Sequence, residues 1–224
     1  MIKKSLSSFA IRKVVEEGKV LEGAFFQKAY QIDHGTIVLR FAVRRSDLEP
    51  FRESNGLVDN LIEEEEEEPE GISLGGGKGQ YVRFDLYFKM GGYLFFSSKI
   101  EASMPTGRSS FAMKLRKELN NRILKDISQV ELDRLVVLTF NPFKDSDEEI
   151  KVYLELFGDG NMIIVKGDMI EAPYTSRSWS SRIVKRGERF VPPPSGIDPF
   201  KLEREEFDLR AEASSEDLVR FLIR

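Results

Sequence analysis

Residues 151–166 read K-V-Y-L-E-L-F-G-D-G-N-M-I-I-V-K, and this stretch decides the fold class. Two apolar runs flank the triplet G-D-G at 158–160. Glycine and aspartate favour the tight reversals of hairpins, so the stretch predicts antiparallel strands at 149–157 and 161–167. Parallel neighbours would need a crossover of a dozen or more residues between them. The stretch therefore favours an antiparallel sheet.

The same pattern of short apolar runs and turn residues occurs elsewhere in the chain. The other six expected strands lie at 23–32, 35–43, 81–90, 93–98, 123–131 and 134–140. Serines that can act as N-caps precede two amphipathic stretches, which predict helices at about 7–20 and 109–121. The expected fold class is α+β, a mostly antiparallel sandwich or barrel-like sheet of about eight strands with two packed helices. A short helical C-terminal tail is expected to follow.

Charge is distributed very unevenly along the chain. Residues 46–70 hold eleven acidic residues and one basic residue, so the remainder is net basic although the whole chain has a formal charge of −4. We expect residues 46–79, including the run Glu63–Glu68, to form an acidic, solvated and largely disordered insertion. It interrupts a domain expected at 1–187. Residues 188–224 are expected to form a proline-rich linker and the first helices of a truncated module, so the chain is interpreted as a fragment of a longer protein.

Several classes of chemistry are disfavoured by composition. The chain has no cysteine and one histidine, His34, which lies in the turn-like stretch Q-I-D-H-G-T. Disulfides and thiolate metal sites are therefore excluded, and cytoplasmic localisation is expected. The stretch L-G-G-G-K-G-Q does not fit the phosphate-binding-loop pattern, and no apolar run approaches the roughly 20 residues of a membrane span. We expect no cofactor, no metal, no membrane association and no small-molecule substrate.

Basic residues gather in two places, which raises the possibility of phosphate binding. The candidate phosphate contacts are Arg108, Lys114, Arg116, Lys117 and Arg122 around the second helix, and Arg182, Lys185 and Arg186 near Tyr174 and Trp179. An exposed aromatic side chain beside them could stack on a base. The alternative is an ordinary solvated helix face and a loop without a ligand.

The dipeptide Asp133-Arg134 stands at the entrance of the apolar run L-V-V-L. One interpretation is local: Asp133 accepts backbone hydrogen bonds, and Arg134 pairs with a neighbouring acid. The other is that the pair acts on a ligand outside the fold. The residues alone leave both open.

Four stretches together resemble one family. They are S-L-S-S-F at the start, P-T-G-R-S-S-F-A-M-K-L-R-K-E-L-N-N-R, L-D-R at 132–134, and L-E-L-F-G-D-G-N-M-I-I-V. They are similar to the N-terminal domain of NFACT proteins, which include fibronectin-binding-protein-A-like proteins and ribosome-associated quality-control factors. The resemblance covers about 1–185, and V-P-P-P-S-G-I-D-P-F looks like the entry to that family's helix-hairpin-helix module.

The resemblance implies a fold similar to the N-terminal domain of formamidopyrimidine-type DNA glycosylases. It does not imply their chemistry, because the start Met1-Ile2-Lys3 lacks their catalytic Pro-Glu; we expect no enzyme activity. It implies binding to an obstructed large ribosomal subunit carrying peptidyl-tRNA, and recruitment of charged tRNA, with alanyl-tRNA expected, for template-free tailing of the stalled peptide. Asp133 and Arg134 match the pair implicated in tRNA recruitment.

One position departs from the family pattern: Ala10 stands where an acidic residue, also implicated in tailing, is common. Two alternative functions follow from the residues and stay open. One is nucleic-acid binding on a glycosylase-like fold without tailing activity. The other is a protein-interaction module.

Overall fold

The computed structural model describes residues 5–48, 80–98, 109–141, 148–194, 203–205 and 208. The expectations for residues 49–79, for Arg108 and for nearly all of the C-terminal helices lie outside these ranges. Residues 46–48, expected to begin the acidic insertion, lie in the short helix α2 (Arg45–Leu48), whose Leu48 is fully buried.

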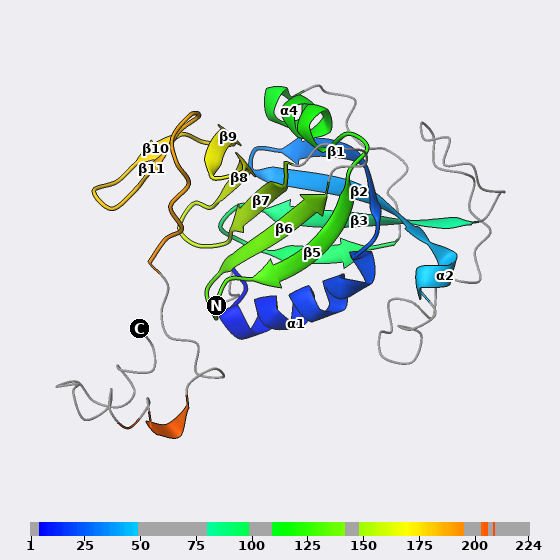
Figure 1. The fold of residues 1–224 in the computed structure, drawn as a ribbon, viewed down its shortest axis with the longest axis horizontal. Coiled ribbons are helices and arrows are strands. Elements are labelled where there is room, and N and C mark those ends of the chain that lie inside the picture. The colour runs from blue at the N-terminus through cyan, green and yellow to red at the C-terminus, as the bar shows by residue number, and fades with distance from the viewer. Residues whose placement is uncertain are drawn as a thin grey trace.

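A nine-stranded antiparallel sheet forms the body of the described chain, in the order β4-β3-β2-β1-β5-β6-β7-β8-β9 (Figure 1). Its strands are β1 (Phe25–Asp33), β2 (Thr36–Arg44), β3 (Tyr81–Lys89), β4 (Leu94–Ser97), β5 (Ile123–Gln129), β6 (Leu135–Asn141), β7 (Ile150–Glu155), β8 (Asn161–Lys166) and β9 (Met169–Pro173). A separate two-stranded ribbon follows, β10 (Arg177–Ser178) with β11 (Ile183–Val184). The expected α+β class is confirmed. The eight expected strands correspond to β1–β8, whereas β9–β11 are too short to show a period in the sequence.

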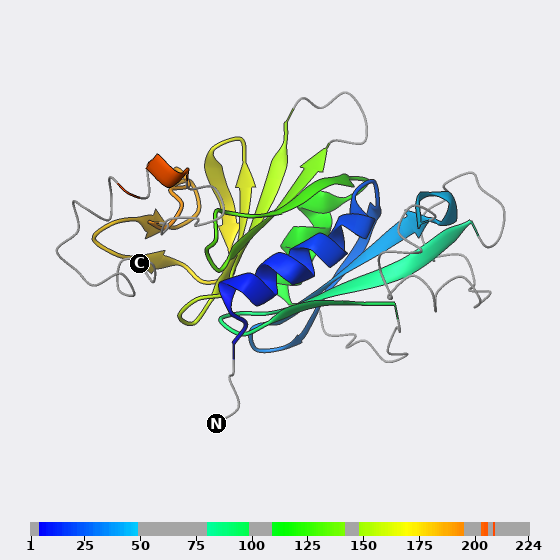
Figure 2. The ribbon, with the colours of Figure 1, turned by 90° about the horizontal axis from the view of Figure 1, so that it is seen from below.

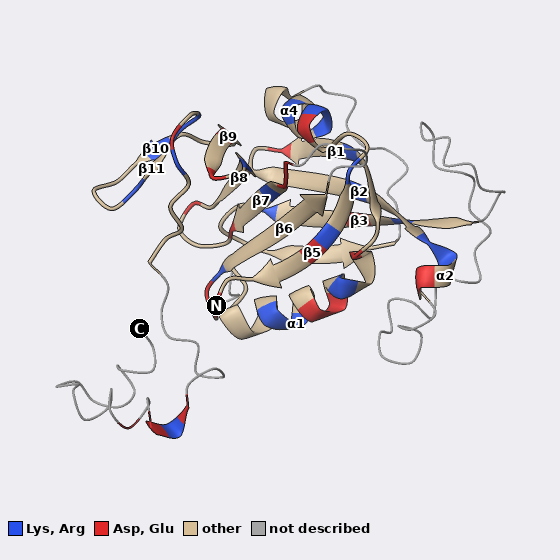
Figure 3. Cartoon of the chain, viewed as in Figure 1, with Lys and Arg blue, Asp and Glu red and all other residues tan. Residues whose placement is uncertain are grey.

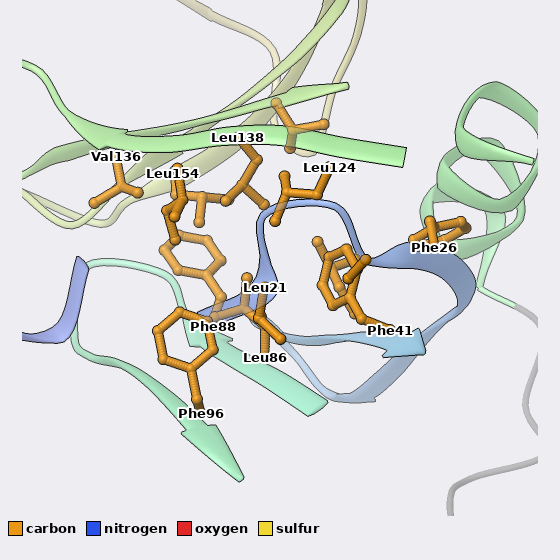
Figure 4. Packing of buried hydrophobic residues seen from close by; sticks show 14 of the residues in the cluster. Leu21, Phe26, Phe41, Leu86, Phe88, Phe96, Leu124, Val136, Leu138 and Leu154 are labelled. Carbon is orange, nitrogen blue, oxygen red and sulfur yellow. The ribbon is translucent and has the colours of Figure 1, made fainter. Parts of the chain in front are cut away.

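The sheet consists of two layers that enclose one core. Strands β4 to β1 form one layer and β5 to β9 the other. The two layers join where β1 pairs with β5, at the residue pair Phe25 and Ile123. Apolar side chains from both layers meet between them (Figure 4). Phe26 packs edge-on against both Phe41 and Phe140, with ring centroids 6.1 and 6.4 Å away. Because this apolar area is removed from water, its burial is the main driving force for closing the sandwich.

Two helices cover the open sides of the sandwich. Helix α1 (Ser8–Gly18) packs against β4 and β5, and helix α4 (Ser110–Leu119) packs against β1 (Figure 2). The expected serine caps are present: Ser7 Oγ accepts from the Ala10 amide at 3.2 Å, and Ser109 Oγ accepts from the Ala112 amide at 3.0 Å. Each cap satisfies an amide at a helix N-terminus that has no partner within the helix.

Two glycine turns close one end of the sandwich. Gly91 lies between β3 and β4 and Gly160 between β7 and β8, with φ of 65° and 70°. A Cβ added to Gly160 would lie 2.0 Å from the Gly91 nitrogen. Only glycine permits both this backbone conformation and this approach. The G-D-G triplet therefore reverses the chain and also docks the second layer against the first.

Candidate nucleic-acid interface

The Asp133-Arg134 pair lies in the turn between β5 and β6, which we call the β5–β6 turn (residues 130–134). The turn is closed by backbone hydrogen bonds from Val130 N to Leu135 O (2.9 Å) and from Asp133 N to Val130 O (3.1 Å). Asp133 Oδ1 accepts from the Arg134 amide at 2.6 Å. The carboxylate thus fixes the backbone of its neighbour, as short polar side chains commonly do in turns.

The β5–β6 turn is also tied to two other elements. Gln129 Nε2 donates to Ser8 O (2.9 Å), in the first turn of α1, and to Asp133 O (2.7 Å). On the other side, Leu156 N donates to Arg134 O at 2.8 Å. Hydrogen bonds to α1, through Gln129, and to Leu156 hold the turn in one geometry, so the direction in which Arg134 leaves the backbone is set by the fold.

The Arg134 side chain is half-buried, and no hydrogen bond or ion pair to its guanidinium occurs within the part of the chain that the structure describes. The local interpretation required an acid beside it, whereas Asp133 uses its carboxylate on the backbone amide. A guanidinium carries several donors in a planar fork and matches phosphate or a base edge well. Arg134 is therefore the cation in this turn that is available to a ligand.

Lys114, on α4, contrasts with Arg134. Its ammonium is bound to Glu171 and lies 3.2 Å from Glu118. The bond to Glu171 raises the pKa of Lys114 and lowers the pKa of Glu171. Its charge is neutralised by two carboxylates that come from α4 itself and from β9.

Arg116 and Arg122 are bound to backbone carbonyls. Arg116 Nε donates to Ala29 O at 2.8 Å. Arg122 Nε donates to Glu118 O at 2.8 Å and its Nη1 to Glu148 O at 3.0 Å; burial lowers its pKa. These two guanidinium groups fasten α4 and the start of β5 to their surroundings. Lys117 is exposed, and no side-chain partner is seen for it among the described residues.

Arg182, in the β10–β11 ribbon, is buried, with 7% of its surface exposed. One of its nitrogens lies 2.8 Å from the carboxylate of Glu155 in β7. Burial raises the pKa of Glu155, and Arg182 opposes that shift. An ion pair this deep lacks a surface to offer a phosphate, so Arg182 fixes the ribbon to the sheet.

The two other predicted contacts in this region are exposed. Arg186 lies 3.3 Å from Glu171, the carboxylate that also binds Lys114, and Lys185 has no side-chain partner among the described residues. The base of the ribbon therefore meets α4 at β9, while Arg182 connects it to β7. In Figure 3, α4 and the β5–β6 turn lie well apart, with the ribbon along a third side.

Sequence reasoning overlooked two residues that organise this end of the fold. Gln129 joins the turn to α1, and its amide in an otherwise alternating strand gave no distinct signal. Glu155 did give one, because a single acid inside the apolar run V-Y-L-E-L-F is buried only with a partner. It lies opposite Leu135, directly after Arg134, and so joins the ribbon to the strand that the turn opens.

Among the described residues, no cluster of three or more histidine, aspartate or glutamate side chains is arranged to hold a metal ion. No helix in the same ranges is both long enough and apolar enough to cross a membrane.

The family model described as NFACT N-terminal and middle domains matches residues 91–224, more than half of the chain. A curated relative, the archaeal Rqc2 homolog aRqcH of Methanocaldococcus jannaschii, is 37% identical over 122 residues. That alignment takes in 53% of this chain and 18% of the relative, so the chain spans less than a fifth of the length of the curated protein it matches.

Solved structures share the fold at lower identity. The N-terminal domain of the fibronectin-binding protein PavA from Streptococcus pneumoniae has a TM-score of 0.65 at 20% identity, covering 93% of this chain and 69% of that one. The N-terminal part of the fibronectin/fibrinogen-binding protein of Streptococcus suis gives 0.67 at 18%, with coverages of 95% and 70%. The fibrinogen-binding protein of Staphylococcus aureus gives 0.63 at 19%, with coverages of 97% and 68%.

These structural likenesses show the fold alone, whereas the family model extends over most of the sequence. The chain belongs to the family of NFACT N-terminal and middle domains.

Proposed function

We propose that this chain is the tRNA-binding and ribosome-binding part of a ribosome-associated quality-control factor. Membership of the NFACT family and the 37% identity to an archaeal Rqc2 homolog support this function. The observation that carries it is the state of Arg134: its backbone amide and carbonyl are held by Asp133 and Leu156, and its guanidinium has no hydrogen-bond or ion-pair partner in the described residues.

In this function Arg134 contacts tRNA and Asp133 positions it. The bond from the Arg134 amide to the Asp133 carboxylate orients the arginine before tRNA arrives. Less side-chain and backbone freedom is then lost on binding. The exposed side chains of Lys117, Lys185 and Arg186 attract the phosphates of the tRNA. Their contribution to the affinity for tRNA therefore falls as the salt concentration rises.

The factor binds the obstructed large ribosomal subunit in the cytoplasm and recruits charged tRNA, alanyl-tRNA by family resemblance. It is a binding factor, and the peptidyl-transferase centre of the ribosome forms the new peptide bonds. Ala10 replaces the acidic residue common in the family and lies two residues after Ser8, which Gln129 connects to the turn. We therefore expect weak tailing and retained tRNA binding, with Ala10→Asp raising the tailing yield.

The test is tRNA recovered with the full-length protein purified from its own cells. We expect Arg134→Ala and Asp133→Ala to lower the recovered tRNA at least about fivefold, the effect of losing one charge-assisted contact of roughly 1–2 kcal/mol. Arg44→Ala is the matched control. It removes the same charge from an exposed position near Phe25, at the opposite end of β5 from the turn.

Equal tRNA recovery from all four proteins would contradict the assignment of the turn. A loss for Arg134→Ala without any change in tailing would instead favour a nucleic-acid-binding protein that does not tail. Its structural neighbours are named as fibronectin-binding and fibrinogen-binding proteins. If tRNA recovery is unaffected but the protein captures fibronectin or fibrinogen, the protein-interaction alternative holds.

A further inference from the structure

The β10–β11 ribbon, residues 174–186, projects from the sheet and ends in the sequence S-W-S-S-R (Figure 1). Its tip is closed by a hydrogen bond from Trp179 N to Arg182 O at 2.9 Å. Trp179 is 42% exposed, an unusual state for the largest apolar side chain when a core lies nearby. The β5–β6 turn does not use this aromatic surface, so its role is unassigned.

The ribbon is firmly held at its base. Besides the buried Arg182–Glu155 pair, Arg177 Nη1 lies 3.1 Å from Asp159 in the β7–β8 turn. The side-chain amide of Asn161 is bonded to both backbone groups of Thr175, at 3.0 and 2.8 Å. The position of Trp179 is therefore set by the sheet.

Cations surround the tryptophan. The guanidinium carbons of Arg177 and Arg182 lie 5.9 and 4.9 Å from the centre of its ring. Residues 174–189 carry five basic residues and one acidic residue. Four of the five pair with carboxylates outside this segment, and Lys185 has no side-chain partner among the described residues. An aromatic ring set among arginines and lysines is the combination by which proteins bind unpaired nucleotides: the ring stacks on a base and the cations attract the backbone.

We propose that the β10–β11 ribbon is a second RNA contact, in which Trp179 stacks on an unpaired base while the exposed Lys185 and Arg186 attract its phosphates. This inference rests on the proposed function, since it assigns the ribbon to the same RNA as the β5–β6 turn.

The fold brings the two contacts to neighbouring positions on β7 and the residue after it. Arg182, the cation packed on Trp179, is anchored to Glu155, and the next residue, Leu156, donates its amide to Arg134 O. Glu155 also pairs with Leu135 across the sheet. The turn and the ribbon are therefore anchored at two adjacent residues, Glu155 and Leu156.

The experiment uses the fluorescence of Trp179, the single tryptophan among the 224 residues. The full-length protein is titrated with a ten-nucleotide oligouridylate, and the signal of Trp179 is isolated as the difference from Trp179→Phe. We expect the oligouridylate to quench this signal, and a blunt RNA duplex with the same number of phosphates to change it little. Trp179→Leu should weaken oligouridylate binding at least about fivefold, whereas Trp179→Phe, which still stacks, should weaken it less than about threefold.

Leucine is the informative replacement because it keeps an apolar cover over Arg182 but cannot stack. The melting temperature of Trp179→Leu is compared with that of the unmodified protein. If Trp179→Leu fails to fold, the proposal is decided by whether oligouridylate quenches Trp179 in the unmodified protein. Absence of quenching overturns the proposal, as does unchanged oligouridylate affinity in a folded Trp179→Leu. If Trp179→Leu no longer binds a protein that the unmodified chain binds, yet keeps its affinity for oligouridylate, the RNA proposal is overturned in favour of a protein partner.

The outcome is separable from that of the proposed function. If Arg134→Ala keeps full tRNA recovery while oligouridylate still quenches Trp179, the turn assignment fails and the ribbon assignment stands. If Arg134→Ala loses tRNA but Trp179 responds to no RNA, the ribbon assignment fails alone.

Discussion

Helix α4 and the β5–β6 turn both carry arginine, yet they use it differently. On α4 and its flank, Arg116 and Arg122 donate to backbone carbonyls, and Lys114 binds two carboxylates. In the turn, Asp133 binds a backbone amide, and the Arg134 guanidinium has no hydrogen-bond or ion-pair partner among the described residues. The density of basic residues in a sequence therefore does not measure the positive charge that a fold presents to RNA.

The largest expected effect tests whether the end of the sandwich that carries the turn is a fixed platform. Gly160→Ala places a Cβ 2.0 Å from the Gly91 nitrogen, at a φ of 70°. We expect it to lower the free energy of unfolding by about 3 kcal/mol or more, since a backbone clash adds to an unfavourable conformation. Urea denaturation measures the loss.

Gly158→Ala is the control within the same turn. Its φ is also positive, at 56°, but no atom lies within 4 Å of the added Cβ. It should cost about 1 kcal/mol, the conformational contribution alone. Equal losses for the two variants would mean that the Gly91–Gly160 contact does not hold the layers together.

A second prediction compares the effect on stability of removing an arginine from each of the two regions. Arg122→Ala leaves the carbonyls of Glu118 and Glu148 without this donor, so the free energy of unfolding should fall by about 1–3 kcal/mol. Arg134→Ala should change it by less than about 0.5 kcal/mol, because its guanidinium makes no hydrogen bond or ion pair with the described residues. If Arg134→Ala destabilises the protein as much as Arg122→Ala, the turn arginine is structural and the contrast disappears.

A third prediction concerns Asp133. Asn retains a side-chain oxygen for the Arg134 amide, whereas Ala does not. Asp133→Ala should lower the free energy of unfolding by about 1 kcal/mol and Asp133→Asn by less than about half of that. Denaturation curves of both variants give the comparison; a larger loss for Asn would show that the charge of Asp133, and not its acceptor, stabilises the turn.

The smallest expected effect is on the acid side of the pH profile. Binding to Lys114 lowers the pKa of Glu171 in the folded state below its ordinary 4.5. The stabilisation is therefore complete above the unfolded pKa and is lost as pH falls through the folded pKa. For a partly exposed pair we expect less than about 1 kcal/mol, so Glu171→Gln should melt lower than the unmodified protein at pH 7, and the difference in melting temperature should shrink as the pH falls below 4.5. A difference that does not shrink on acidification would argue against this ion pair.

The sequence predicted what local chemistry controls. Serine caps and helical spacing located α1 and α4, and turn residues between apolar runs located β1–β8. Strands β9–β11 were missed because two to five residues show no period, and β10 and β11 are held by Arg182 and Val184 contacts made far along the chain.

The candidate site was predicted in part for the same reason. The position of Asp133-Arg134 in a turn followed from the apolar run after it, but the hydrogen bonds that fix the turn involve Ser8 and Leu156, which are distant in sequence. The partners of Lys114 and Arg182, Glu171 and Glu155, lie in other strands as well. Whether a cation is available is a property of the tertiary structure.

The most direct test of this account is the affinity of the full-length protein for tRNA when one arginine is removed from each region. Arg134→Ala and Arg116→Ala remove the same side chain and charge, and each is measured at a temperature at which melting shows it folded. The account predicts a rise of at least about fivefold in the dissociation constant for Arg134→Ala and less than about twofold for Arg116→Ala. Equal changes in the two variants, or a larger change for Arg116→Ala, would contradict it.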